Sequence, residues 1–183
     1  DGFYVFDVNT PNGTLKDIKF QLPGRHNMEN AVAAIAVADY LGISSEKIHE
    51  ALASFIGVKR RFNRFMIHNK VYVDDYAHHP TELNAVIRSL KELYPGKKLL
   101  GVFQPHLFTR TRDFASEFAE SLSELDELIL LDIYPARELP IEGITSKWLL
   151  DMVNLKEKSV YSLEEALPAI QSKDFDVLLT VGA

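Results

Sequence analysis

Hydrophobic and polar positions divide the sequence into two parts with different patterns. In the first part, apolar and polar residues alternate over Phe3–Val8 and again over Leu15–Leu22. The segment Pro11-Asn12-Gly13 lies between these runs, so the pattern predicts a β-hairpin. Apolar residues then recur at helical spacing in two segments that end at Gly42 and Gly57. The first part is therefore expected to be a hairpin followed by a pair of helices.

From Phe62 onward the pattern changes to strands alternating with helices, which is typical of a parallel sheet covered on both faces. The sequence thus predicts an α/β fold with a Rossmann-like, mostly parallel sheet over residues 58–183, preceded by the hairpin and helix pair of residues 1–57. Pro168 lies in the last expected helix and is expected to interrupt it. A hairpin arm should lead the sheet near Phe65–His68, and the five core strands are expected at Val71–Asp75, Lys98–Phe103, Glu127–Ile133, Ser159–Tyr161 and Asp176–Val181.

Composition narrows the classes of function. The 183 residues carry 26 acidic and 20 basic side chains, for a formal charge of -6, which argues against a general nucleic-acid or membrane-surface binder. The absence of cysteine excludes disulfides, thiolate metal sites and a cysteine nucleophile. No apolar run approaches the roughly 20 residues of a membrane span, so a cytoplasmic protein is expected. Both ends fall at expected strands, and we expect both to be cut from a longer chain.

Three expected loops follow strands of the parallel sheet, where ligands bind in such folds because loops and helix amino termini converge there. These loops are Asp74–Pro80, Gln104–Arg112 and Tyr134–Glu138. The first places two carboxylates and two imidazoles within six positions, which favours a functional cluster. Alternatively, Asp75 and His79 only cap the following helix. A zinc or manganese site is the minor alternative, because adjacent histidines on one turn do not easily face one ion.

Two groups of basic side chains are candidates for binding an anion. The second loop contains His106, Arg110 and Arg112, and a guanidinium group can hold a carboxylate or phosphate through two parallel hydrogen bonds. For Arg112, pairing with Asp113 or Glu117 on a solvated helix is the favoured alternative. The other group lies at the expected junction of the two parts, where it could contact a nucleotide phosphate, and consists of Lys59, Arg60, Arg61 and Arg64.

The segment that leads into the first helix holds further polar candidates. Asn27 fits the N-cap position of that helix, with His26 as an ordinary surface residue. Asn30 falls in the first turn, where its amide could instead read the edge of a nucleotide base.

Four motifs, taken together, resemble those of the Mur ligase family in their order and spacing. They are Gly24-x-His26-Asn27-x-x-Asn30, Gly57–Phe62, Asp74–Glu82 and Phe103–His106. The resemblance covers nearly the whole chain and implies a three-domain protein. Residues 1–57 would be the end of its central ATP-binding domain, and residues 58–183 most of its carboxy-terminal ligase domain.

The resemblance implies ATP as a cofactor, together with Mg²⁺. His26 and Asn30 would contact the adenine, Asp75 the ribose and Arg61 the terminal phosphate, although sequence alone does not rank Asp74 against Asp75. Phosphoryl transfer also needs a lysine-bearing loop of the form G-x-x-x-x-G-K-[ST], and no segment here matches it. That loop and the metal ligands are expected upstream, so residues 1–183 alone are expected to be inactive.

The resemblance also implies the substrates, since the motifs are closest to those of members that join L-alanine to UDP-N-acetylmuramate in peptidoglycan synthesis. ATP would phosphorylate the sugar's carboxylate, and the amine of L-alanine would attack the acyl phosphate. His78 and Arg110 would face L-alanine, with help from Arg112. His78, next to the amine, and Arg61, at the terminal phosphate, are the implied catalytic residues. Leu107 departs from the pattern, because many members have a second arginine there.

Two alternatives to this function stay open. One is a sibling ligase that recycles a murein peptide onto UDP-N-acetylmuramate. The other is a non-catalytic module that binds a nucleotide. The motif Phe103–His106 and the pattern Tyr134-x-Ala136-x-Glu138 favour the alanine enzyme over its sibling.

Overall fold

The computed structural model describes residues 4–182 and consists of two compact units, residues 1–58 and 59–183. Phe3, the first residue of one expected strand, and Ala183 lie outside the described residues. The observed division falls one residue beyond the expected one. The assignment of the first unit to a central ATP-binding domain stays a prediction. None of the described helices combines the length and the apolar character needed to cross a membrane.

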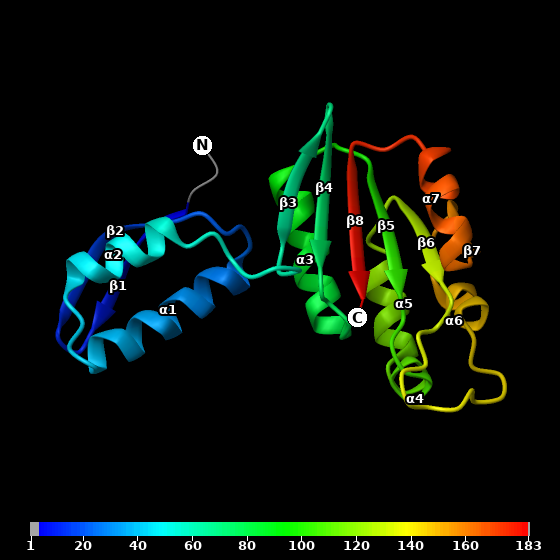
Figure 1. The fold of residues 1–183 in the computed structure, drawn as a ribbon, viewed down its shortest axis with the longest axis horizontal. Coiled ribbons are helices and arrows are strands. Elements are labelled where there is room, and N and C mark those ends of the chain that lie inside the picture. Colours follow the sequence, from blue (N-terminus) through cyan, green and yellow to red (C-terminus); the bar gives the residue numbers. More distant parts are fainter. Residues whose placement is uncertain (1–3, 183) are drawn as a thin grey trace. The chain divides into compact units, whose positions relative to one another are not determined.

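The first unit is a β-hairpin packed against two helices (Figure 1), as the alternating and helical patterns predict. Its strands pair antiparallel, with a shift of register between Phe6 and Val8. Opposite this shift, Asp17 has a φ of 55° and its amide donates to Asp7 Oδ1 at 2.9 Å. The elements are β1 (Tyr4–Thr10), β2 (Gly13–Phe20), α1 (Arg25–Tyr40) and α2 (Ser45–Ser54).

The start of α1 differs from the expectation. Gly24 occupies the N-cap with a φ of 98°, a conformation that favours glycine, and no side chain caps the helix. Asn27 lies inside the first turn, and its Nδ2 donates to the carbonyl oxygen of Pro23 at 2.7 Å. The predicted N-cap role of Asn27 is therefore wrong, because the glycine turns the chain into the helix earlier.

The second unit is a six-stranded, mostly parallel sheet with helices on both faces, which confirms the predicted fold class (Figure 1). The strand order is β3-β4-β8-β5-β6-β7, and β3 pairs antiparallel with β4 as the expected hairpin arm. The elements are β3 (Asn63–Ile67), β4 (Lys70–Asp75), α3 (Pro80–Leu93), β5 (Leu99–Gln104), α4 (Phe108–Asp113), α5 (Ala115–Leu122), β6 (Glu127–Leu131), α6 (Ser146–Met152), β7 (Lys158–Tyr161), α7 (Leu163–Gln171) and β8 (Val177–Gly182).

The two faces of this sheet are buried against different helices. Helices α3, α5 and α6 cover one face through a core that includes Leu83, Phe103 and Phe118. Helix α7 covers the other face, where it packs on Leu100 and Ile129. Because the central strands are buried on both sides, their sequences read as continuous apolar runs.

Two helical segments differ from the predictions. Helix α7 continues past Pro168 to its end at Gln171, because burial against the sheet outweighs the one backbone hydrogen bond that proline lacks. The segment expected to be a loop as far as Arg112 contains the six-residue helix α4, which Phe114 separates from α5. Arg110 and Arg112 consequently lie on a short helix.

Candidate functional site

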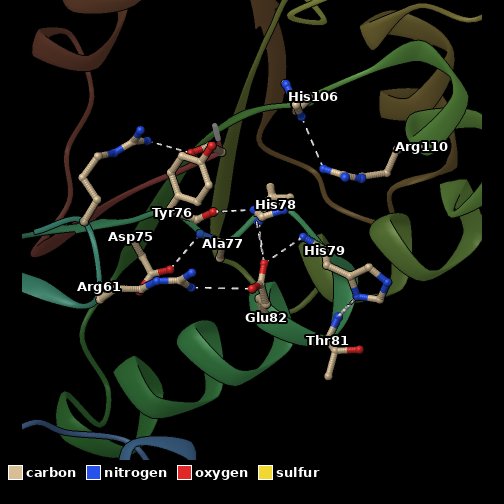
Figure 2. Close-up of polar contacts among 12 residues, drawn as sticks. Arg61, Asp75, Tyr76, Ala77, His78, His79, Thr81, Glu82, His106 and Arg110 are labelled. Carbon is tan, nitrogen blue, oxygen red and sulfur yellow. Dashed lines mark hydrogen bonds and ion pairs between the residues drawn. The ribbon is translucent and has the colours of Figure 1, made fainter. Parts of the chain in front are cut away.

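The three loops that the sequence singled out lie together at the carboxyl ends of the strands. The ring of His78, after β4, lies 6.4 Å from the ring of His106, after β5, measured between centroids. His106 in turn stacks on Tyr134, after β6, at 5.7 Å. Figure 2 shows His106 and Arg110 across from His78. The sheet thus assembles one cluster from segments that are far apart in the sequence.

Asp75 anchors the first loop from within. Its side chain accepts hydrogen bonds from the amides of Phe62 and Ala77, each at 2.7 Å, through its two different oxygens. The residue is 6% exposed, and such a buried carboxylate needs these donors to replace water. Asp75 therefore joins the chain that enters β3 to the chain that leaves β4, while its contact with a ribose stays a prediction.

His79 caps α3, which confirms for this residue the alternative that the sequence left open. Its Nδ1 accepts from the amide of Thr81 at 3.3 Å, and Glu82 accepts from the amide of His79 at 3.2 Å, so the two form a capping box. Pro80 takes the first helical position. The His79 ring packs edge-on against Phe114 at 4.7 Å and is a structural part of the loop.

His78 is oriented for a different task. Its Nδ1 lies 2.8 Å from the carbonyl oxygen of Tyr76 and 3.4 Å from Glu82 Oε2 (Figure 2). A carbonyl oxygen can only accept, so Nδ1 carries the hydrogen. When the ring is neutral, its lone pair is therefore on Nε2, which can accept a proton from an amine.

Glu82 also belongs to the site, although the sequence analysis included it only as the last residue of the motif Asp74–Glu82 and predicted no role for it. Its Oε2 accepts from the amides of His78 and His79, and its Oε1 lies 3.6 Å from Arg61 Nη1. Burial opposes ionisation, but the His78 amide and charge, the His79 amide and the Arg61 charge together hold the pKa of Glu82 below its usual value. The capping pattern, in which Glu82 stands three positions after His79, was the available signal.

Two guanidinium groups lie over the ring of Tyr76. Those of Arg60 and Arg61 lie 4.8 and 5.9 Å from its centroid. Arg60 also donates to the carbonyl oxygen of Gly182 at 2.6 Å and lies 3.5 Å from Asp74 Oδ2. Arg61 is 52% exposed, so the geometry leaves Arg61 better able than Arg60 to meet an anion.

His106 and Arg110 form a pair on the opposite side of the cluster. Arg110 Nη1 lies 3.3 Å from His106 Nδ1 (Figure 2). Burial, with the nearby charges of Arg110 and His78, lowers the pKa of His106, which keeps the ring neutral and able to accept from the guanidinium. Arg112 instead donates through Nε to Asp113 Oδ1 at 2.7 Å on the exposed surface, which is the pairing that the alternative predicted, while its help in holding L-alanine stays a prediction.

The start of α4 is held by Glu138, another residue quoted only within a motif. Its carboxylate accepts from the amide of Thr109 at 2.9 Å and from the Thr109 hydroxyl. These two donors, the hydroxyl before the amide, lower the pKa of Glu138. Sequence reasoning missed Thr109, because its partner lies beyond an entire strand and helix.

The remaining predicted residues lie on other elements. His26 is half-buried and Asn30 is exposed, both near the start of α1 in the first unit, and their contact with adenine stays a prediction. Arg64 lies on β3, where its Nη1 is 3.4 Å from the Tyr94 hydroxyl. Within residues 4–182, no three histidine or acidic side chains group closely enough to hold a metal ion. A zinc or manganese site built from three such side chains is therefore not found among the described residues, and the position of the Mg²⁺ ligands stays a prediction.

Comparisons with known proteins place this geometry in a family. The family model described as Mur ligase, glutamate ligase domain, matches residues 60–183. The UDP-N-acetylmuramate–L-alanine ligase of Flavobacterium psychrophilum is 57% identical over 185 residues, and that of Flavobacterium johnsoniae is 55% identical over 184 residues. Each match covers 100% of this chain and 41% of the relative, so the chain spans about two fifths of the length of these relatives.

Solved structures agree on the fold. UDP-N-acetylmuramate-alanine ligase MurC from Thermotoga maritima matches with a TM-score of 0.74 and 28% identity, covering 100% of this chain and 42% of that one. A folylpolyglutamate synthase from Mycobacterium tuberculosis matches with a TM-score of 0.78 over the same shares, but at 19% identity it supports the fold alone.

Proposed function

The chain belongs to the Mur ligase family, and from this premise we propose that the full-length protein uses ATP to join L-alanine to UDP-N-acetylmuramate in peptidoglycan synthesis. The observation that carries the proposal is that His78, in the loop after β4, lies next to His106 and Arg110 after β5, and that Arg110 is hydrogen-bonded to the His106 ring. An amino acid carries a carboxylate and an amine, and these residue types suit both groups. The identity to enzymes named for this reaction supports the choice of substrate.

The amino-acid substrate is assigned to this cluster. Arg110 holds the carboxylate of L-alanine through its guanidinium group, which is suited to two parallel hydrogen bonds. The amine attacks the acyl phosphate carbon, phosphate leaves, and Nε2 of His78 accepts the proton that the new amide nitrogen must lose. His106, held neutral, orients Arg110 without adding a competing positive charge.

ATP is assigned to the side of the cluster formed by Arg61 and Tyr76. Arg61 meets the terminal phosphate, because its guanidinium group is half exposed and only loosely paired with Glu82. His26 and Asn30 contact the adenine. Asp75 contributes mainly by fixing the loop, since this residue is only 6% exposed. When Mg²⁺ is bound, it neutralises charge on the transferred phosphoryl group, with ligands from outside residues 4–182.

The test is ADP release by the full-length protein with Mg²⁺, ATP and UDP-N-acetylmuramate, with and without L-alanine. Release that depends on L-alanine is expected. Release with a murein tripeptide in place of L-alanine would move the assignment to the recycling ligase. Silence with both acceptors would contradict ligase activity and favour a nucleotide-binding module. The 183-residue chain alone is expected to release no ADP, because it lacks a sequence of the phosphate-loop type.

A further inference from the structure

Helix α4 carries Arg110 but lacks the means to hold itself in place. It has six residues, Phe108–Asp113, and helices this short are not stable alone in water. Its N-cap is Leu107, which has a φ of 70° and offers no side-chain acceptor to the free amides of the first turn. The position of Arg110 must therefore be set from outside the helix.

The loop after β6 supplies the missing support. The amide of Tyr134 donates to the carbonyl oxygen of Pro105 at 2.8 Å, and the amide of Leu107 donates to that of Tyr134 at 3.0 Å. These bonds extend the parallel pairing of β5 and β6 up to Leu107, the N-cap of the helix. The ring of His106 also stacks on the ring of Tyr134, so side chains reinforce the same pairing of the two segments.

A turn in the same loop brings a carboxylate to the helix start. Ala136 has a φ of 49°, and the amide of Glu138 donates to the carbonyl oxygen of Pro135 at 2.9 Å, which closes the turn. The Glu138 carboxylate then accepts from both the amide and the hydroxyl of Thr109, the second residue of α4. Glu138 thus satisfies a free amide of the first turn, as an N-cap side chain does in an ordinary helix, but from a distant part of the same chain.

We propose that Glu138 is a positioning residue for the amino-acid substrate: it caps α4 from the neighbouring loop and thereby fixes Arg110, the next residue after Thr109, against His106. This inference rests on the proposed function, because it needs Arg110 to hold the substrate carboxylate. Glu138 itself touches no substrate in this arrangement. Its loss lets α4 shift or fray, which costs binding of the amino acid more than binding of ATP.

The experiment uses the full-length protein with Glu138→Ala and Glu138→Gln. The matched control is Glu142→Ala, in the same loop, whose exposed carboxylate makes no hydrogen bond or ion pair within the described residues. The KM for L-alanine is expected to rise about tenfold or more in Glu138→Ala, with the KM for ATP within about twofold of the wild type. Glu138→Gln should recover part of the loss, since its amide oxygen still accepts from Thr109, and Glu142→Ala should match the wild type.

A second comparison separates positioning from general destabilisation. In an Arg110→Ala background, adding Glu138→Ala should raise the KM for L-alanine by less than about twofold, because the residue that it positions is already gone. An unchanged KM for L-alanine in active Glu138→Ala, full additivity with Arg110→Ala, or a parallel rise of both KM values would each overturn the proposal. If the wild type itself shows no release with L-alanine, the proposed function fails instead. Hydrogen exchange over residues 108–113 then decides whether Glu138 holds the helix, with faster exchange in Glu138→Ala than in Glu142→Ala as the expected result.

Discussion

Replacing Asp75 by alanine tests whether this carboxylate is the internal support of the first loop. In the structure it binds the amides of Phe62 and Ala77, which are 3% and 0% exposed. After the substitution, water has little access to either amide, and both lose a charged partner. The structural role therefore predicts a large loss of stability. Replacing a residue whose only role is to bind a ligand would lower the stability little when no ligand is bound.

The magnitude follows from those two bonds. A hydrogen bond to a charged group contributes about 1.5–3 kcal/mol, and two such bonds, allowing for some relaxation of the loop, give a loss of about 3–5 kcal/mol. A domain of about 125 residues is typically stable by about 6–19 kcal/mol, so Asp75→Ala should leave the second unit folded but much weaker. The neutral alanine also leaves no buried charge unpaired, which keeps the estimate at the level of the lost bonds.

The assay is urea unfolding of the 183-residue chain, followed by the fluorescence of Trp148. This is the single tryptophan of the sequence, and it packs against the core of the second unit, so the signal reports that unit alone. Asp132→Ala is the control, because Asp132 follows β6 with an exposed side chain that makes no hydrogen bond or ion pair within the described residues. A loss below about 1 kcal/mol for Asp75→Ala, or an equal loss for both variants, would refute the reasoning.

Three further predictions concern charge. Glu127 is 3% exposed, and although burial raises the pKa of its carboxyl, two lysine partners hold that pKa below the usual value. The contribution of Glu127 to stability should therefore be complete above about pH 4.5 and be lost as the pH falls through the lowered pKa. In urea unfolding measured at a series of pH values, Glu127→Gln should reduce the loss of stability on the acid side. Arg110→Ala should raise the KM for L-alanine about tenfold or more, while Arg112→Ala stays within about twofold in the same steady-state assay, since Arg112 pairs with a neighbour at the surface. In an NMR titration, the pKa of His106 should lie below its ordinary value, chiefly because of burial and then of nearby positive charge, and Arg110→Ala should move that pKa upward; no movement would count against the observed pair.

The secondary structure could largely be predicted from the sequence because it depends on local patterns. The apolar runs at β5 and β6 are buried on both faces, as their continuity indicates. Errors arose where a distant contact outweighed a local preference. Pro168 stays inside α7 because the sheet buries that helix, and residues up to Arg112 are helical because the next loop supplies a cap.

The candidate site shows the same division between its residues. Motif chemistry pointed to His78 and Arg110, and the structure places both at one cluster. Motif chemistry did not reveal that Asp75 is buried, nor that Glu82 links Arg61 to the first loop. These properties depend on which segments become neighbours.

The sequence by itself determined the order of the strands and of most helices, the α/β class, the family and the edge of the sheet where the candidate loops lie. It could do so because periodicity, capping and motif spacing act over a few residues. Only the tertiary structure decided that β8 pairs between β4 and β5, and that the loops after β4, β5 and β6 meet through His78, His106 and Tyr134. It also decided that Glu138 caps α4, a helix from which it is distant in the sequence. The physical reason is that strand order and side-chain partners arise from long-range packing, in which many distant segments compete for the same contacts, and no short stretch of sequence records the outcome.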